Sequence, residues 1–271
     1  MLRRILLVLD DSGHSEAALD LAISWAKRYS AELRAVTFLN RAGIQRREPV
    51  PIGGMAYKVQ RDAALLSRAA AGVENATATF RERSLASGLA TDVQNLSGDS
   101  KAQLRTAAQA ADIVVVGRDA ALSPDGTPGE MLRTLVRVGG SARPVIAVPT
   151  LTADSGEVLV VWNGDAATAR SIQTYCLLGL ERDTGLVVLP VNQSAERSAT
   201  IVQDFFSLHG YRSSIAASTA QNLTAESLEA AAARIAAPLI LMGSPDGSRL
   251  RRLFASPMYR LLERIRRPVF L

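Results

Sequence analysis

The stretch 3-RRILLVLDDSGHSEAALDLA-22 decides the fold. Its apolar run has the length of one strand and lacks the polar alternation of a half-exposed strand, which predicts a strand buried on both faces. A polar turn containing Asp10 follows. The next residues repeat apolar side chains at helical spacing, with Leu19, Ala22 and Ala26 on one face. A buried strand, a polar turn and an amphipathic helix are the opening units of a parallel α/β sheet.

The same order of landmarks occurs twice in the chain. The stretch 156-GEVLVVWNGDAATARSIQTY-175 repeats the opening strand, turn and helix, with Asn163 at the position of Asp10. Two later pairs match in the same order: 110-AADIVVVGR-118 with 236-AAPLILMGS-244, and 142-ARPVIAVP-149 with 266-RRPVFL-271. We therefore predict two similar domains, residues 1–150 and 151–271, joined by the polar stretch 149-PTLTADSGE-157.

Within each half, apolar runs alternate with helical patterns, which predicts a small doubly wound unit of five parallel strands with helices on both faces. The first half is longer, and its extra residues fall in a Gly-, Pro- and Arg-rich loop over 40–58 and in the helical stretch that follows. In the first half we expect strands near 4–9, 32–39, 90–95, 112–117 and 144–149, and helices near 14–29, 58–87, 101–110 and 130–141. In the second half we expect strands near 157–162, 185–191, 212–217, 238–242 and 267–271, with helices between them.

Composition excludes several classes of protein. The apolar runs are strand-sized, far below the roughly 20 residues of a membrane-spanning helix, and no secretory signal pattern opens the chain, so we expect a cytoplasmic protein without a membrane partner. The net charge is +5, but the arginines interleave with acidic residues over most of the chain, which does not favour nucleic acid as a partner. The single Cys176 lies among apolar residues and is expected in the core.

Polar residues stand at the predicted carboxyl ends of the first strand of each half. The Asp10 carboxylate either accepts hydrogen bonds from an adenine amine or ribose hydroxyl, or accepts them from backbone amides of the turn. Asn163 is its counterpart in the second half and carries no charge. Both positions are candidate nucleotide-binding residues.

Glycines close the fourth predicted strand of each half, where a missing side chain lets backbone amides approach a phosphate. In the first half this is Gly117, followed by Arg118. In the second half it is Gly243, and hydroxyl, amide and guanidinium groups that would suit an anion follow it in the sequence. These further candidates are Gly247, Ser248, Arg249 and Ser256.

Other chemistry is missing from the sequence. No Gly-Lys pair is present, so there is no Walker-type P-loop, and no G-x-G-x-x-G follows the first strand. With only His14, His209 and one cysteine, we expect neither a metal site nor a Cys/His nucleophile, and we identify no catalytic residue. His14 and its neighbours Ser12 and Ser15 are expected to cap a helix.

These residues resemble the universal stress protein family in its tandem, two-domain form. The stretch 5-ILLVLDDSGHSEAALDLA-22 is similar to the opening of the family domain, and 242-MGSPDGSRLRRLFASPMYRLLERIRRPVFL-271 is similar to its last segment. The resemblance implies two flavodoxin-like domains, of the adenine nucleotide alpha hydrolase-like kind, that pair as an internal pseudo-dimer. In one branch of the family it implies ATP bound between the first-strand acid and the glycine loop.

That ATP-binding branch carries G-x-x-G-x9-G-[ST], and both halves differ from it. In the second half Gly243 matches, Asp246 replaces the second glycine, and Ala255-Ser256 replaces Gly-Ser. In the first half Gly117 matches, but Ala120 and Glu130-Met131 replace the remaining positions. The resemblance therefore implies altered binding of ATP or another adenine nucleotide, retained in the second half.

We accordingly expect a stress-response binding or signalling protein. One alternative is an interaction protein that binds no nucleotide and presents its basic C-terminal surface, or the arginines of the 40–58 loop, to a protein partner. A further alternative is a weak ATPase, although no metal-holding acid, base or Walker lysine is evident. A homodimer is compatible with each of these hypotheses.

Overall fold

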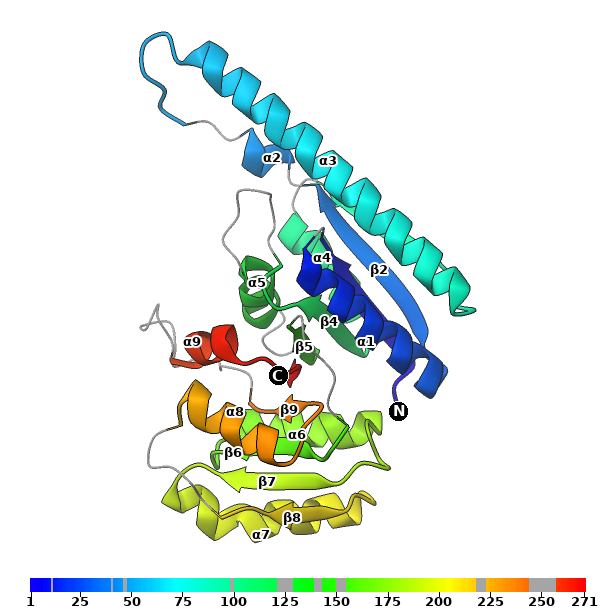
Figure 1. The fold of residues 1–271 in the computed structure, drawn as a ribbon, viewed down its shortest axis with the longest axis vertical. Helices are drawn as coiled ribbons and strands as arrows, with labels where there is room; N and C mark the ends of the chain where they lie inside the picture. The colour runs from blue at the N-terminus through cyan, green and yellow to red at the C-terminus, as the bar shows by residue number, and fades with distance from the viewer. Residues whose placement is uncertain are drawn as a thin grey trace.

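The structure is a computed structural model that describes residues 1–10, 12–39, 41–45, 48–97, 100–120, 129–138, 143–149, 155–217, 223–243 and 257–271. Its ten described strands form one sheet in the order β3-β2-β1-β4-β5-β10-β9-β6-β7-β8 (Figure 1). The second five strands repeat the order of the first five, read from the opposite edge. The internal repeat of the sequence is thus a repeat of the sheet.

The first half supplies five strands and five described helices. They are β1 (Arg4–Leu9), α1 (Gly13–Tyr29), β2 (Glu32–Leu39), α2 (Arg41–Ile44), α3 (Met55–Ala86), β3 (Asp92–Ser97), α4 (Ser100–Gln109), β4 (Ile113–Gly117), α5 (Glu130–Val138) and β5 (Val145–Val148). The second half supplies β6 (Val158–Trp162), α6 (Ala166–Leu178), β7 (Leu186–Pro190), α7 (Gln193–Leu208), β8 (Ser213–Ile215), α8 (Ala225–Arg234), β9 (Ile240–Leu241), α9 (Pro257–Arg264) and β10 (Val269–Phe270).

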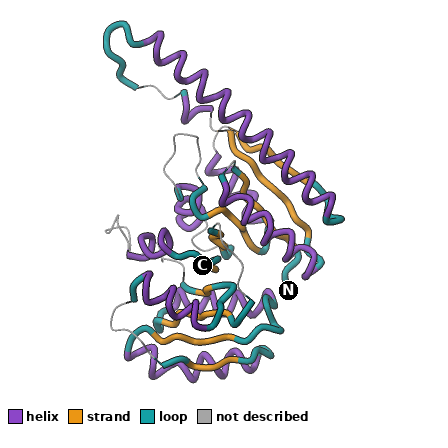
Figure 2. The backbone as a smooth tube through the Cα atoms, viewed as in Figure 1, coloured by secondary structure: helices purple, strands orange, loops and turns teal. Residues whose placement is uncertain are grey.

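The sheet separates two layers of helices (Figure 2). Alternate residues of β1 point to opposite faces, so that Ile5 and Leu7 join one buried cluster and Leu6 and Val8 the other. The first cluster takes its helical side chains from α1, α3, α6 and α7, and the second takes them from α4, α5, α8 and α9. Strands covered on both faces explain the near-continuous apolar runs of the sequence.

The two halves meet at their fifth strands. Strands β10 and β5 pair in the antiparallel sense, with Val269 opposite Ala147 and Phe270 opposite Ile146. All the remaining strand pairs in the described sheet are parallel. The amide of Leu271 donates to the carbonyl of Val145 at 2.9 Å. This pairing places the two sets of five strands edge to edge around an approximate two-fold axis.

The fold class expected from the sequence is confirmed: a mixed α/β fold with a mainly parallel sheet and helices on both faces. Cys176 and the α1 face formed by Leu19, Ala22 and Ala26 are buried, as expected. The 40–58 segment holds the short helix α2, which the sequence pattern did not predict. No helix in the described ranges is both long and apolar enough to cross a bilayer.

Candidate functional site

Each half has a point at which the strand order reverses. Strand β1 lies between β2 and β4, and β6 lies between β7 and β9. In each half, therefore, the chain first adds strands on one side of its first strand and then on the other side. In open α/β sheets, ligands bind outside the carboxyl ends of the strands at such a switch point. The candidate residues Asp10 and Gly117 lie at the first switch point, and Asn163 and Gly243 lie at the second.

In the first half, the Asp10 carboxylate is held by the turn into α1. Its Oδ1 accepts hydrogen bonds from the Ser12 amide at 3.2 Å and from the Ser12 hydroxyl at 2.6 Å. The Ser15 hydroxyl also donates to Oδ1 and accepts from the Asp10 amide at 3.0 Å. Ser12 is the N-cap residue of α1, but its side chain makes no capping hydrogen bond. The turn therefore uses Asp10 as its acceptor, and the expected capping by the Ser12 side chain is wrong.

Gly117 is the point of contact between β4 and α1. A Cβ atom at this position would lie 2.9 Å from the carbonyl carbon of His14 and 3.0 Å from the amide nitrogen of Ser15. Real Cβ atoms do not approach backbone so closely, so only glycine lets the first turn of α1 pack against the end of β4. The residue thus has a packing role independent of any phosphate.

The second switch point has the same arrangement with different side chains. Asn163 Oδ1 accepts from the Thr168 hydroxyl at 2.7 Å, as Asp10 accepts from Ser15, and it also accepts from the Asp165 amide at 3.0 Å. Asp165 is the N-cap of α6: its Oδ1 accepts from the Thr168 amide at 2.7 Å, and its Oδ2 accepts from Asn163 Nδ2 at 2.7 Å. Gly243 faces Thr168 as Gly117 faces Ser15. The repeat thus extends to the hydrogen bonds of the site.

Arg118 connects the first switch point to the second half. Its Nη1 donates to the carbonyl of Ile265 at 2.7 Å, and Nε and Nη2 each donate to the Asp119 carboxylate at 3.0 Å. Asp119 also lies 3.2 Å from His14 Nε2. Burial raises the pKa of Asp119, but the hydrogen bond and charge of Arg118, together with His14, outweigh burial and hold that pKa below its usual value. The carboxylate fixes the guanidinium in the orientation that reaches Ile265.

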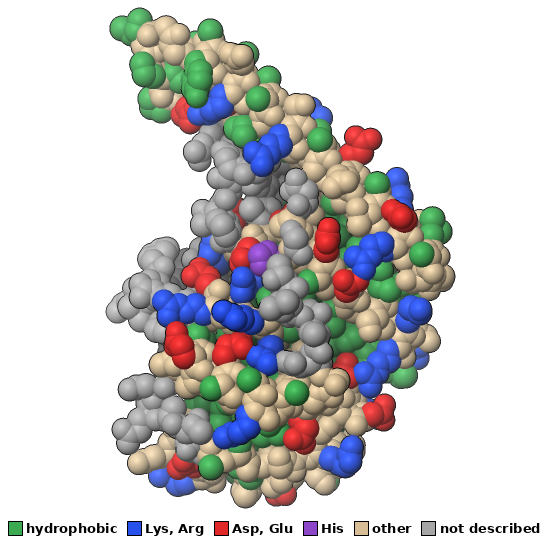
Figure 3. Space-filling view, viewed as in Figure 1, with side chains coloured by type: hydrophobic (Ala, Val, Ile, Leu, Met, Phe, Trp, Pro, Cys, Tyr) green, Lys and Arg blue, Asp and Glu red, His purple; other side chains and the backbone are tan. Residues whose placement is uncertain are grey.

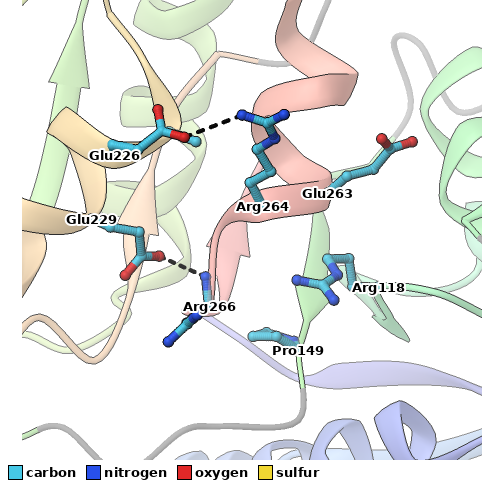
Figure 4. A pocket seen from close by; sticks show the side chains of 8 residues that line it. Arg118, Pro149, Glu226, Glu229, Glu263, Arg264 and Arg266 are labelled. Carbon is cyan, nitrogen blue, oxygen red and sulfur yellow. Dashed lines mark hydrogen bonds and ion pairs between the residues drawn. The ribbon is translucent and has the colours of Figure 1, made fainter.

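Arg118 also lines a cavity of about 640 Å³ where the two halves meet (Figure 4). Pro149 contributes from the first half, and Glu226, Arg264 and Arg266 contribute from the second. Arg264 pairs with Glu226 at 3.1 Å in an exposed ion pair. The lining includes guanidinium groups from Arg118, Arg264 and Arg266 and carboxylates from Glu226, Glu229 and Glu263, so it carries both signs of charge.

The cavity beside Asp10 is much smaller, at about 40 Å³, and is lined by α1 side chains together with Asn75 and Thr79 of α3. Pockets for small ligands measure about 300–1,000 Å³, so the space enclosed by these described residues is smaller than such a pocket. The candidates Gly247, Ser248, Arg249 and Ser256 lie outside the described residues, as do the segments 121–128 and 244–256 that follow β4 and β9.

Sequence reasoning missed the polar partners of the site. Ser15 and Thr168 each stand five residues after the strand-end residue that they contact, and aligning the two halves on Asp10 and Asn163 would have paired them. The contact of His14 with Asp119 had no such signal, since it depends on β1 and β4 being neighbours in the sheet. The sequence placed His14 at the start of the helix, which is correct, but assigned it only a capping role.

A mainly parallel sheet that is wound in both directions from a switch point belongs to the doubly wound, Rossmann-like class of folds. The family model described as "Universal stress protein family" matches residues 1–127. This part of the chain therefore belongs to the universal stress protein family.

Solved structures share the fold over the whole chain. A universal stress protein from Archaeoglobus fulgidus DSM 4304 is 17% identical with a TM-score of 0.66, and the match covers 98% of this chain and 97% of that chain. A functionally unknown protein from Pseudomonas aeruginosa PAO1 is 16% identical with a TM-score of 0.54, covering 99% and 92%. No curated protein matches the sequence. At these identities the likeness establishes the fold of both halves.

Proposed function

We propose that this protein is a tandem universal stress protein, with domains over residues 1–150 and 151–271, that binds an anionic ligand in its second domain during a stress response. The ligand class that the family resemblance favours is an adenine nucleotide. The residues proposed to contact this ligand are Asn163 and Gly243 at the switch point and, after it in sequence, Gly247, Ser248, Arg249 and Ser256. The proposal is a binding function and assigns no catalytic residue.

One observation carries this proposal: Asn163 replaces Asp10 in an otherwise matched arrangement. The first switch point holds the carboxylate of Asp10, which would repel a phosphate, and the carboxylate of Asp119, which Arg118 already occupies. At the second, Asn163 presents a neutral amide, and the single described carboxylate, Asp165, has both oxygens in hydrogen bonds at 2.7 Å. The sequence then adds hydroxyl and guanidinium groups after Gly243. The second domain is the better host for a phosphate.

Equilibrium titration with ATP, ADP, AMP and cyclic nucleotides tests the proposal. Replacing Gly243 is a poor test, because any side chain there collides with Thr168. We therefore compare Arg249→Ala in the second domain with Asp10→Asn in the first. Arg249→Ala should weaken binding about tenfold, the loss of one charge-assisted hydrogen bond, and Asp10→Asn should leave the affinity unchanged. Binding that responds only to Asp10→Asn would place the ligand in the first domain.

A second candidate function is an interaction protein that binds no nucleotide. It is favoured by the Asp10 carboxylate, whose Oδ1 already accepts from Ser12 and Ser15, and by the cavity of about 40 Å³ beside it. In that case no nucleotide would give saturable binding. An acidic partner would instead be retained on the intact protein and lost from the double variant Arg251→Glu, Arg252→Glu.

A further inference from the structure

Helix α3 extends well beyond the body of the protein (Figure 1). It has 32 residues, whereas its counterpart α7 has 16. At 1.5 Å per residue α3 is about 48 Å long. Its buried residues are Asp62, Ala76, Phe80 and Ser84, and the two that join the hydrophobic core, Ala76 and Phe80, lie in its C-terminal part. We call residues 48–75 the arm: the N-terminal part of α3 with the segment that leads into it.

One row of side chains runs along α3 with alternating steps of three and four residues. We call this row the seam, and its members are Ala56, Val59, Ala63, Leu66, Ala70, Val73, Thr77 and Phe80. Large apolar residues occur at every seventh position, and the intervening positions hold three alanines and a threonine. An apolar repeat of this spacing is the pattern by which two helices pack side by side.

The seam is covered at one end and exposed at the other. Phe80 is fully buried against the sheet, Leu66 and Val73 are half-buried, and Val59 is 62% exposed. The alanines of the seam are exposed as well. A seven-residue repeat drifts about 20° per heptad around a straight helix, so the row that faces the core at Phe80 winds toward solvent along the arm. Among the described residues, nothing covers this outer part.

The arm is stiffened from within, and its charges are neutralised locally. Asp62 is buried and pairs with Lys58 and, at 2.8 Å, with Arg61, which in turn reaches Glu48 at 2.5 Å. The hydrogen bonds from Lys58 and Arg61 lower the pKa of Asp62. These pairs link the segment before α3 to the helix, so the arm holds its shape.

The end of the arm is apolar. Residues 49–57 include no charged side chain. Ile52, Met55 and Tyr57 are 108%, 60% and 72% exposed, respectively. Figure 3 shows hydrophobic side chains gathered over this end of the molecule. A neutral surface of this kind can meet its own copy without repulsion between like charges.

We propose that the exposed part of the seam pairs with the same part of a second copy of this chain, forming a two-fold dimer through the arms. The alanines let the helix backbones approach closely, and the large residues between them fill the interface. The exposed apolar side chains of each arm are Ile52, Met55 and Val59 together with the alanines of the seam, and over both arms they would bury on the order of 1,000 Å². That area is near the lower limit for a specific interface, so the dimer should dissociate in the micromolar range.

Sedimentation velocity on the full chain over a wide concentration range tests this proposal. The wild-type protein should shift from monomer to dimer as its concentration rises, and Val59→Glu should abolish the shift. Leu85→Glu is the matched control, because Leu85 is 65% exposed on the same helix but lies off the seam. A monomer at every concentration, or equal effects of the two variants, would overturn the proposal.

Cysteine cross-linking tests the interface independently of its affinity. The one native cysteine, Cys176, is fully buried, so an introduced cysteine is the accessible thiol. Under mild oxidation, at least one of Ala56→Cys, Ala63→Cys and Ala70→Cys should form a disulfide-linked dimer. Ala64→Cys and Ala71→Cys, exposed on another side of α3, should not. Equal cross-linking of the seam variants and the off-seam variants would contradict the proposed dimer. Cosedimentation of the protein with lipid vesicles in place of dimerisation would contradict it as well. Neither result depends on nucleotide binding.

Discussion

A Cβ atom on Gly243 would lie 2.5 Å from the hydroxyl oxygen of Thr168 and 2.7 Å from its amide nitrogen. Thr168 is 1% exposed and begins the inner face of α6, so it has no room to withdraw. The end of β9 and the first turn of α6 are therefore packed backbone to backbone. Gly117 and Ser15 repeat the relationship in the first half.

Gly243→Ala should destabilise the protein by about 1–3 kcal/mol, because an added methyl group must push α6 away from the sheet. Urea unfolding measures the difference. Gly88→Ala provides the comparison: Gly88 has a φ of +73° and nothing within 4 Å of the added carbon, so its cost is conformational, roughly 1–2 kcal/mol. The backbone contact would be in doubt if Gly243→Ala unfolded like the wild type.

Asp165→Ala should destabilise the protein by about 1 kcal/mol, since it removes the side chain that caps α6 through the Thr168 amide. Ser12→Ala at the matching position of α1 should have a smaller effect, because the Ser12 side chain caps no amide there. Thermal unfolding of both variants provides the measurement. Equal losses of stability would contradict the difference between the two turns.

Asp119→Asn should reduce stability by about 1 kcal/mol at neutral pH, because the charge-assisted hydrogen bonds that orient Arg118 toward Ile265 are weakened. The folded-state pKa of Asp119 lies below its usual value, so this contribution is complete above the unfolded-state pKa of about 3.9. It is lost as the pH falls through the lower, folded-state pKa. The stability difference between variant and wild type should therefore shrink in strong acid, as the pH falls below about 4.

Cys176 should be inert in the native protein. Burial raises the pKa of its thiol to about 12, with a smaller opposing effect of Arg182, and thiolate is the reactive form. A thiol reagent at pH 8 should therefore modify the denatured chain and leave the folded chain untouched over the same time. Rapid labelling of the folded protein would show that α6 opens locally.

The sheet was predictable from sequence because burial on both faces requires continuous apolar residues, and β1, β4 and β6 are runs of that kind. The start of β3 was placed two residues early, at 90 in place of Asp92, since this edge strand is more polar than the others. Helix α3 was also predicted, but its projection was not. Helical spacing shows that a face is apolar without showing which element, if any, lies against it.

The site was predictable in position and less so in detail. Asp10 and Asn163 end apolar runs, and parallel strands carry their ends to one edge of the sheet. The sequence left open whether Asp10 meets a ligand or the turn, and the hydrogen bonds to Ser12 and Ser15 favour the turn. The reach of Arg118 to Ile265 depends on how the halves meet, which no local pattern encodes.

The antiparallel pairing of β5 with β10 joins two units that lie on one polypeptide. In an assembly of identical subunits every mutation would appear at both switch points at once. Here each mutation alters one of them and leaves its neighbour intact. Such a chain is free to specialise: the acid at position 10 and the amide at position 163 can be inherited together, and one unit can support the shared sheet while the other acquires a new specificity.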